Sequence, residues 1–230
     1  DDLAEAAFER DLVFISGLSN ESADCFPDVI ARASAAGARI ATNPGIRQLS
    51  SRADEFFGCL DRISILTLNR LESEQLVPRL IAGGTADQRS TIKPAGNPNS
   101  LVDRGLMAGG FNLPFDSYVR AITSLGVEML LVTNGSDGAY VGTADAIWHC
   151  TVPSVEVAGT AGAGDAFAST FAGMMTTGAS IEDALKSATC NAGSVVSHLD
   201  TQTGLLNREG LARRVAKFDD RLVVTRWDIG

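Results

Sequence analysis

Short apolar runs alternate with helical patterns along most of this chain, and this alternation limits the folds open to it. The runs lie at residues 12–16, 39–42, 63–68 and 128–133. Continuous apolar runs of this length are typical of strands that are buried on both faces of a parallel sheet. Helical segments between such strands predict right-handed βαβ units whose helices cover both faces. The sequence therefore predicts an α/β fold of three layers, α/β/α, around a mostly parallel central sheet.

The composition predicts one globular domain and argues against a nucleic-acid-binding protein. A chain of 230 residues is long enough to bury a substantial core in a single domain, residues 1–230. Hydrophobic residues make up 45% and charged residues 20%, as in ordinary globular proteins. The formal net charge of −9 argues against a nucleic-acid-binding protein, which needs a basic face. It does not exclude a nucleotide, because backbone N–H groups and a metal ion can hold phosphate.

The sequence also predicts a cytoplasmic protein without contact to a membrane. No apolar run approaches the roughly 18 residues needed to span a bilayer, and Asp1-Asp2 does not resemble the start of a signal peptide. The four cysteines are scattered, without a Cys-x-x-Cys pair. Such cysteines are typical of reduced, mostly buried thiols in a cytoplasmic enzyme.

A glycine-rich stretch at residues 157–167 leads into a helical pattern that continues through Met175. Small residues let the backbone approach a ligand closely and take positive φ where needed, and they stand here at Gly159, Gly162, Ala163 and Gly164. A loop that runs into a helix aims unpaired N–H groups and the positive end of the helix dipole at one spot, which suits a phosphate. Asp165 then stands where the helix begins. Helix capping is the alternative role for Asp165, but a cap alone does not call for the small residues before it.

Three motifs in the chain resemble those of the ribokinase-like (PfkB) family of carbohydrate and nucleoside kinases. Residues 160–167 resemble its signature Asp-Thr-x-Gly-Ala-Gly-Asp, residues 132–138 its Val-Thr-x-Gly-x-x-Gly, and residues 69–72 its Asn-x-x-Glu. Three motifs in the right order are more specific than one glycine-rich loop. The resemblance runs from about Asp11 to about Arg214 and implies the ribokinase-like fold. The family's opening portion, which carries the lid and much of the sugar site, has no counterpart here.

The resemblance implies a site for ATP and Mg²⁺. In the family the last Asp of the signature is the catalytic base, which implies that role for Asp165. The backbone N–H groups of Gly162, Ala163 and Gly164 would then hold the negative charge of the transferred phosphoryl group. The implied cofactor-binding residues are Asn69, Thr133, Asn134, Gly135, Gly138, Thr160 and Asn191. Asn69 and Glu72 are also the implied magnesium residues, acting through water.

Several of these residues have a structural alternative. Asn69 and Glu72 have the spacing of a capping box, in which Asn69 caps a helix and Glu72 is its N3 residue. The turn at residues 135–138 can be a β-hairpin turn with nothing bound. Asn191 can be an ordinary polar residue of a helix. Asn69 and Glu72 can form a capping box and also help to organise magnesium.

Two departures from the family are visible. Gly159 replaces an Asp or Asn, and in some members a carboxylate there helps to bind an activating potassium ion, so dependence on a monovalent cation is in doubt. Residues 82–114 are rich in glycine and proline, which predicts an irregular stretch. The stretch looks like an insertion, either a surface excursion without a role or a flap over the substrate.

These observations predict an ATP-dependent kinase that phosphorylates an alcohol group of a small sugar. A nucleoside such as adenosine is the alternative substrate, although an aromatic content of only 6% slightly favours a sugar. A non-catalytic nucleotide- or sugar-binding module is the alternative from another class. A dinucleotide-dependent oxidoreductase is disfavoured, because the glycines do not fit Gly-x-Gly-x-x-Gly. Whether the protein forms a homodimer stays open.

Overall fold

The structure is a computed structural model and describes residues 4–230, so the first three residues of the predicted domain lie outside the described residues. Its main sheet has seven strands in the order β1-β2-β3-β6-β7-β8-β9. They are β1 (Leu12–Ile15), β2 (Arg39–Thr42), β3 (Ile65–Asn69), β6 (Met129–Thr133), β7 (Ala139–Gly142), β8 (Ala146–Cys150) and β9 (Val224–Asp228). Strands β1, β2, β3 and β6 pair in parallel, and β7, β8 and β9 extend the sheet in antiparallel fashion.

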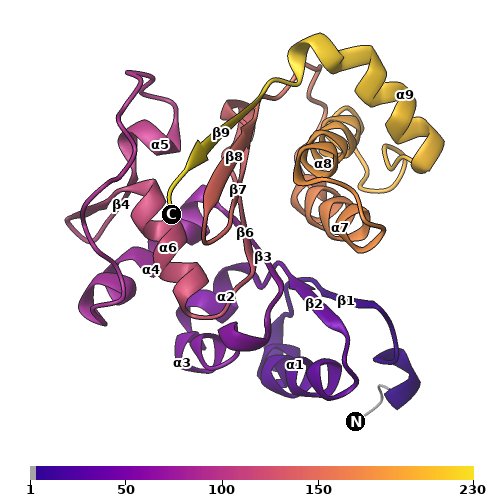
Figure 1. Cartoon of the computed structure of the whole chain (residues 1–230). Coiled ribbons are helices and arrows are strands. Elements are labelled where there is room, and N and C mark those ends of the chain that lie inside the picture. The colour runs from indigo at the N-terminus through magenta and orange to yellow at the C-terminus, as the bar shows by residue number, and fades with distance from the viewer. Residues whose placement is uncertain (1–3) are drawn as a thin grey trace.

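Helices cover both faces of this sheet (Figure 1). One layer holds α1 (Phe26–Ala35), α2 (Gly45–Ser50), α3 (Ala53–Phe57), α4 (Arg70–Ala82) and α6 (Phe115–Ser124), and the other holds α7 (Ala163–Thr176), α8 (Ile181–Val195) and α9 (Arg208–Phe218). Short 3-10 helices lie at Glu5–Ala7, Asn20–Cys25, Leu60–Arg62, Gly135–Asp137 and Asp219–Arg221. The predicted three-layer α/β/α fold around a mostly parallel sheet is confirmed.

Two hydrophobic cores, one on each face, hold the layers together. Along a strand successive side chains point to opposite faces. Leu66 and Leu130 therefore join the core beneath α4 and α6, whereas their neighbours Ile65 and Leu131 join the core beneath α7 and α8. This two-sided burial is the physical reason for the continuous apolar runs in the sequence.

Residues 82–114 are more regular than the sequence predicted. The segment 83–100 is irregular as expected, but a short helix, α5 (Leu101–Arg104), and an antiparallel hairpin of β4 (Leu106–Ala108) and β5 (Phe111–Leu113) follow it. The prediction is therefore wrong for this second part. Gly109 (φ 58°) and Gly110 (φ 82°) form the hairpin turn, and two positive φ values are what a tight two-residue hairpin connection requires. The paired residues Leu106 and Leu113 are fully buried and belong to the core beneath α4 and α6.

Within residues 4–230, no helix is both long enough and apolar enough to cross a bilayer. The four cysteines are free thiols: Cys25 is exposed, and Cys59, Cys150 and Cys190 are buried. The prediction of reduced, mostly buried thiols is confirmed.

Alkylation of the native protein with iodoacetamide at pH 8 is expected to modify Cys25 alone. Burial raises the pKa of Cys150 and of Cys190 to about 11, so both thiols are almost entirely protonated at that pH as well as inaccessible. Intact mass and peptide mapping check this, with a fully denatured sample as the control in which all four cysteines react. Modification of Cys150 as fast as Cys25 would contradict the buried position of β8.

Candidate active site

The carboxyl ends of the parallel strands bring the predicted site residues together. Ser16 follows β1, Asn43 follows β2, Asn69 ends β3 and Thr133 ends β6. Asn69 and Thr133 are direct partners in the β3–β6 register. Helix α7 packs against β1, β2 and β3, which places its N-terminus and Asp165 beside these strand ends. Open α/β sheets bind ligands at this edge.

The start of α7 has the backbone geometry of an anion site. Its N-cap Gly162 is left-handed (φ 78°), and the first helical hydrogen bond runs from the Ala166 N–H to the Gly162 carbonyl at 2.9 Å. The N–H groups of Gly164 and Asp165 precede that bond and have no acceptor within the helix. Of the predicted N–H groups of Gly162, Ala163 and Gly164, that of Ala163 instead donates to the Thr160 carbonyl at 3.5 Å. Of the small residues singled out in this loop, Gly162 alone has a positive φ. Gly164 has helical geometry. Its lack of a side chain therefore lets a ligand approach the backbone closely, and a left-handed backbone is not needed there.

The carboxylate of Asp165 is exposed at this helix end and receives a hydrogen bond from a serine hydroxyl. The Ser16 Oγ donates to Asp165 Oδ1 at 2.8 Å. Asn43 lies on the same side, because a Cβ placed on Gly164 would be 3.7 Å from its Nδ2. Sequence reasoning missed Ser16. Its position directly after a buried parallel strand was the available signal.

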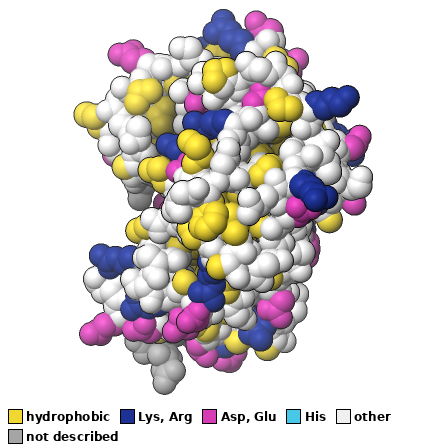
Figure 2. Space-filling model, turned by 90° about the vertical axis from the view of Figure 1, so that its left-hand side faces the viewer, with side chains coloured by type: hydrophobic (Ala, Val, Ile, Leu, Met, Phe, Trp, Pro, Cys, Tyr) yellow, Lys and Arg dark blue, Asp and Glu magenta, His cyan; other side chains and the backbone are white. Residues whose placement is uncertain are grey.

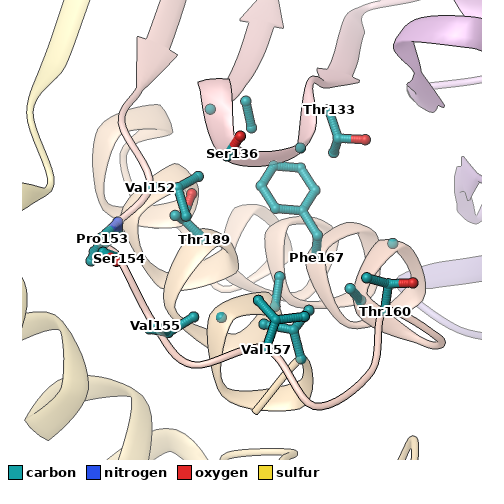
Figure 3. A pocket seen from close by; sticks show the side chains of 18 residues that line it. Thr133, Ser136, Val152, Pro153, Ser154, Val155, Val157, Thr160, Phe167 and Thr189 are labelled. Atoms are coloured by element: carbon teal, nitrogen blue, oxygen red, sulfur yellow. The ribbon is translucent and has the colours of Figure 1, made fainter.

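A pocket of about 510 Å³ lies beside the α7 N-terminus (Figure 3). Six of the predicted site residues line it: Thr133, Gly135, Gly138, Thr160, Ala163 and Gly164. The other lining residues are Ser136, Ala139, Val152, Pro153, Ser154, Val155, Val157, Phe167, Thr189, Ala192, Gly193 and Val196. Polar backbone groups thus lie at the strand ends and the α7 N-terminus, and mostly apolar side chains form the rest.

The apolar part of the pocket has a flat ring and one buried hydroxyl. Phe167 points from α7 into the middle of the pocket, toward Thr133 and Ser136 (Figure 3). The segment 152–155 forms one wall, and sequence reasoning missed it. Thr189 on α8 is 3% exposed, and within residues 4–230 its Oγ1 meets the Cys150 thiol but makes no hydrogen bond of good geometry. A thiol is a weak partner, and a bound ligand could satisfy this buried hydroxyl better.

Asn69 and Glu72 form the capping box that the sequence allowed. Asn69 Oδ1 accepts from the Glu72 N–H at 2.9 Å, and Glu72 Oε2 accepts from the Asn69 N–H at 2.8 Å. Burial raises the pKa of the Glu72 carboxyl, and the hydrogen bond from Asn69 opposes that rise. Among residues 4–230, no group of three or more His, Cys, Asp or Glu side chains could form a metal cage. One carboxylate and one amide fit a Mg²⁺ ion that keeps most of its waters and binds phosphate oxygens.

The side chains of two predicted cofactor residues point to other partners. Asn191 is buried, donates from Nδ2 to Thr170 Oγ1 at 2.7 Å and accepts from the Leu206 N–H at 3.0 Å. Its neighbours Ala192 and Gly193 line the pocket instead. Asn134 is also buried, and its Nδ2 donates to the Asn99 carbonyl at 3.3 Å.

The glycine-rich loop before α7, residues 157–164, is here called the anion loop. At Gly159 it is hydrogen-bonded to the chain that follows α8. The N–H groups of Ala158 and Gly159 both donate to the Val196 carbonyl, at 2.8 and 3.2 Å. A Cβ on Gly159 would lie 3.3 Å from the His198 carbonyl, so the two chains pass close together here.

Part of the chain matches a known protein family in sequence. Residues 116–208 match the sequence profile of pfkB family carbohydrate kinases. The matched region contains two of the three motifs, and over it the predicted resemblance is confirmed. No curated protein sequence matches the chain.

Solved structures match almost the whole chain. An E. coli protein assigned as ribokinase II, with ATP and Mg²⁺, is 17% identical with a TM-score of 0.69, and the match covers 94% of this chain and 62% of that one. The chain has the ribokinase fold. Arabidopsis thaliana ribokinase with ribose and ATP (20% identity, TM-score 0.65, 92% and 57% covered) shares it. So does a nucleoside kinase from Methanocaldococcus jannaschii (18% identity, TM-score 0.66, 90% and 56% covered). The chain therefore spans about three fifths of the length of these ribokinase-fold proteins.

Proposed function

We propose that this chain is the catalytic part of an ATP-dependent kinase that phosphorylates an alcohol group of a small sugar. The observation that carries the proposal is the position of Asp165. Its carboxylate lies in the first turn of α7, directly after Gly164, which lines the pocket, and it contacts the Ser16 hydroxyl. The Ser16 hydroxyl donates to it at 2.8 Å, and the hydroxyl of a substrate would make the same kind of contact.

In this proposal, the site provides a chemical group for each function that phosphoryl transfer requires. The nucleotide base and ribose would lie in the pocket beside Phe167, with the phosphates directed toward the start of α7. The N–H groups of Gly164 and Asp165 would bind the transferred phosphoryl group, whose charge grows on its equatorial oxygens. Asp165 would accept the proton of the acceptor hydroxyl as that oxygen attacks the γ-phosphate. The acceptor would approach from the side of Ser16 and Asn43.

Magnesium would be held near Asn69 and Glu72, mainly through its own waters. When bound, the ion neutralises part of the charge on the phosphates. Asn69 is the partner of Thr133 in the sheet, and Thr133 lines the pocket, so this pair of residues lies at the phosphate end of the proposed nucleotide site.

A nucleoside acceptor and a non-catalytic binding module are the alternatives. The structural relatives include one protein with ribose and ATP bound and one nucleoside kinase, so the fold accommodates both acceptor classes. The exposed carboxylate at the anion site favours catalysis over binding alone, because a site that only bound phosphate would gain nothing from a negative charge beside it.

A phosphotransfer screen tests the proposal. The protein is incubated with ATP and Mg²⁺ and a panel of pentoses, hexoses, sugar acids and nucleosides, and ADP formation is measured. ATP binding is measured separately by calorimetry. Transfer to a sugar supports the proposal, and transfer to nucleosides alone replaces the substrate class. Binding of ATP without transfer to any acceptor, with the same result for a chain extended to the full length of its relatives, would favour the binding module.

A separate prediction concerns Thr189, one of the residues that line the pocket. Thr189→Val keeps the side-chain shape and removes a buried hydroxyl that has only the weak Cys150 thiol beside it, so we expect nearly unchanged stability. If the hydroxyl contacts the nucleotide, ATP affinity falls by about fivefold, the equivalent of roughly one hydrogen bond. Thermal unfolding and calorimetric titration with ATP and GTP check both parts. Equal ATP affinity in the variant would place the hydroxyl outside the nucleotide contacts.

A further inference from the structure

Residues 89–103, here called the brace segment, cross the face of the molecule that carries α4 and α6, opposite α7 and α8 (Figure 1). Figure 2 looks at this side, where positive and negative side chains are interspersed over the surface. The brace segment lies in the stretch that interrupts the regular alternation of strands and helices. Although it begins without helix or strand, charged and hydroxyl side chains hold it at both ends.

A buried carboxylate fixes the first end of the brace segment. The side chain of Asp116 on α6 is 1% exposed, and its Oδ2 accepts from the Thr91 N–H at 2.6 Å and the Thr91 Oγ1 at 3.0 Å. Arg120 donates to the same oxygen at 3.1 Å and also to the Arg89 carbonyl at 3.1 Å. Burying a carboxylate this deeply is costly unless its hydrogen bonds are made, and the brace segment and the partly exposed Arg120 make them.

A second carboxylate folds the middle of the segment. Asp103 accepts from the Ala95 N–H at 2.9 Å and from the Asn97 N–H at 2.5 Å. Leu101 and Val102 beside it are buried in the core beneath α4 and α6. The segment is therefore fixed in place where it reaches Asn99 and Leu101.

The far end of the brace segment contacts the turn at residues 134–138, which lines the pocket. The Asn99 carbonyl accepts from Asn134 Nδ2 at 3.3 Å, and the Leu101 N–H donates to Tyr140 Oη at 3.0 Å. Tyr140 is the second residue of β7 after the turn and is 1% exposed. Its ring packs against Phe115, with ring centroids 4.9 Å apart.

The other side of the turn is held by β8. Burial lowers the pKa of His149, so its ring is neutral at pH 7, and its Nε2–H donates to the Asp137 carbonyl at 2.8 Å. The His149 ring also packs on Tyr140, with centroids 4.5 Å apart. Gly138 has φ 105°, and a Cβ there would be 2.3 Å from His149 Nε2, so the turn lies directly on this ring. The residues of Gly135–Asp137 are exposed, and the His149 ring holds this part of the turn through the Asp137 carbonyl.

We propose that the brace segment positions the turn at residues 134–138 for the nucleotide, with Asn134 and Tyr140 as the positioning residues. This inference rests on the proposed function, because it assigns the pocket to a nucleotide. It also changes the role predicted for Asn134: its side chain holds the turn from behind, while Thr133, Gly135 and Gly138 line the pocket. The Tyr140 side chain and the Asn134 amide support the turn from behind, and the brace segment supplies the hydrogen-bond partners of the Tyr140 hydroxyl and of the Asn134 amide.

Tyr140→Phe tests the inference because it removes the acceptor of the Leu101 N–H and keeps the ring. We expect ATP affinity to fall by about fivefold, with kcat and the KM of the acceptor within about twofold of wild type. Hydrogen exchange followed by mass spectrometry should become faster at residues 99–104 and also at 134–138. The matched control is Tyr118→Phe, a fully buried tyrosine on α6 whose hydroxyl faces Ser73 instead of the brace segment. It should leave ATP affinity and exchange at 134–138 unchanged.

Asn134→Ala is the second variant, because its side chain reaches the segment without entering the core beneath α4 and α6, and it should show the same pattern. Faster exchange confined to residues 99–104, with wild-type ATP affinity in both variants, would overturn the inference. Failure of the wild-type protein to bind ATP would instead overturn the proposed function. In that case exchange at 134–138 alone decides whether the segment positions the turn.

Discussion

The Asp165→Asn variant is expected to lose about a thousandfold in phosphotransfer rate while it binds ATP with nearly wild-type affinity. Asparagine keeps the shape of the side chain and its contact with Ser16, but it cannot accept a proton from the acceptor hydroxyl. Positioned general bases contribute about a hundred- to ten-thousandfold to such rates. The pocket is lined by other residues, so the nucleotide loses no contact with its walls.

Asp183→Asn is the matched control for this prediction. Asp183 also lies in the first turn of a helix and accepts from a serine hydroxyl, Ser180 Oγ, at 2.7 Å, compared with 2.8 Å for Ser16 and Asp165. Both variants remove a negative charge from a helix N-terminus, so both should lower stability by a similar small amount. Only the Asp165 variant should lose activity. Equal activity in the two variants would leave Asp165 with only a favourable charge at the helix N-terminus and no catalytic role.

Much of the fold could be predicted because burial on both faces leaves a direct mark on the sequence. The runs that became β1, β2, β3 and β6 are apolar at consecutive positions, since each strand contributes to both cores. The β4–β5 hairpin was missed for a local reason. Gly109-Gly110 was interpreted as a break in regular structure, whereas two adjacent glycines with positive φ also form the tightest hairpin turn.

The candidate site could be predicted where it consists of backbone groups. The anion loop and the turn at residues 134–138 depend on glycines that are visible in the sequence, and the structure brings both to one pocket. Side-chain directions could not be predicted in this way. Asn134 belongs to a motif, yet it points to Asn99, and Ser16 belongs to none, yet it contacts Asp165. Both contacts join segments at least 35 residues apart, so no local pattern encodes them.

The second large effect is expected at Gly162. Gly162→Ala should lower the free energy of unfolding by about 1–2 kcal/mol, because an alanine is strained at φ 78°. The added Cβ would also lie 2.9 Å from the Thr201 Cβ, closer than real Cβ atoms approach. The loop must then move away from residue 201, and the first turn of α7 moves with it. We expect a loss of more than about tenfold in phosphotransfer, since small misplacements of catalytic groups have effects of this size.

Two other glycines separate backbone strain from damage to the site. Gly178 also has a positive φ (83°), but a Cβ there would meet nothing within 4 Å. Because Gly178 lies at the far end of α7, Gly178→Ala should lower the stability and leave the activity unchanged. Gly164 has helical geometry, and its Cβ would meet only Asn43 Nδ2 at 3.7 Å. Gly164→Ala should therefore keep or raise stability, because alanine favours the helix by about 1 kcal/mol. Its methyl group would still stand where the phosphoryl group is proposed to bind, so activity should fall. Full activity in Gly164→Ala would show that the phosphate does not bind at the α7 N-terminus. This conclusion would not depend on how Gly162→Ala affects the fold.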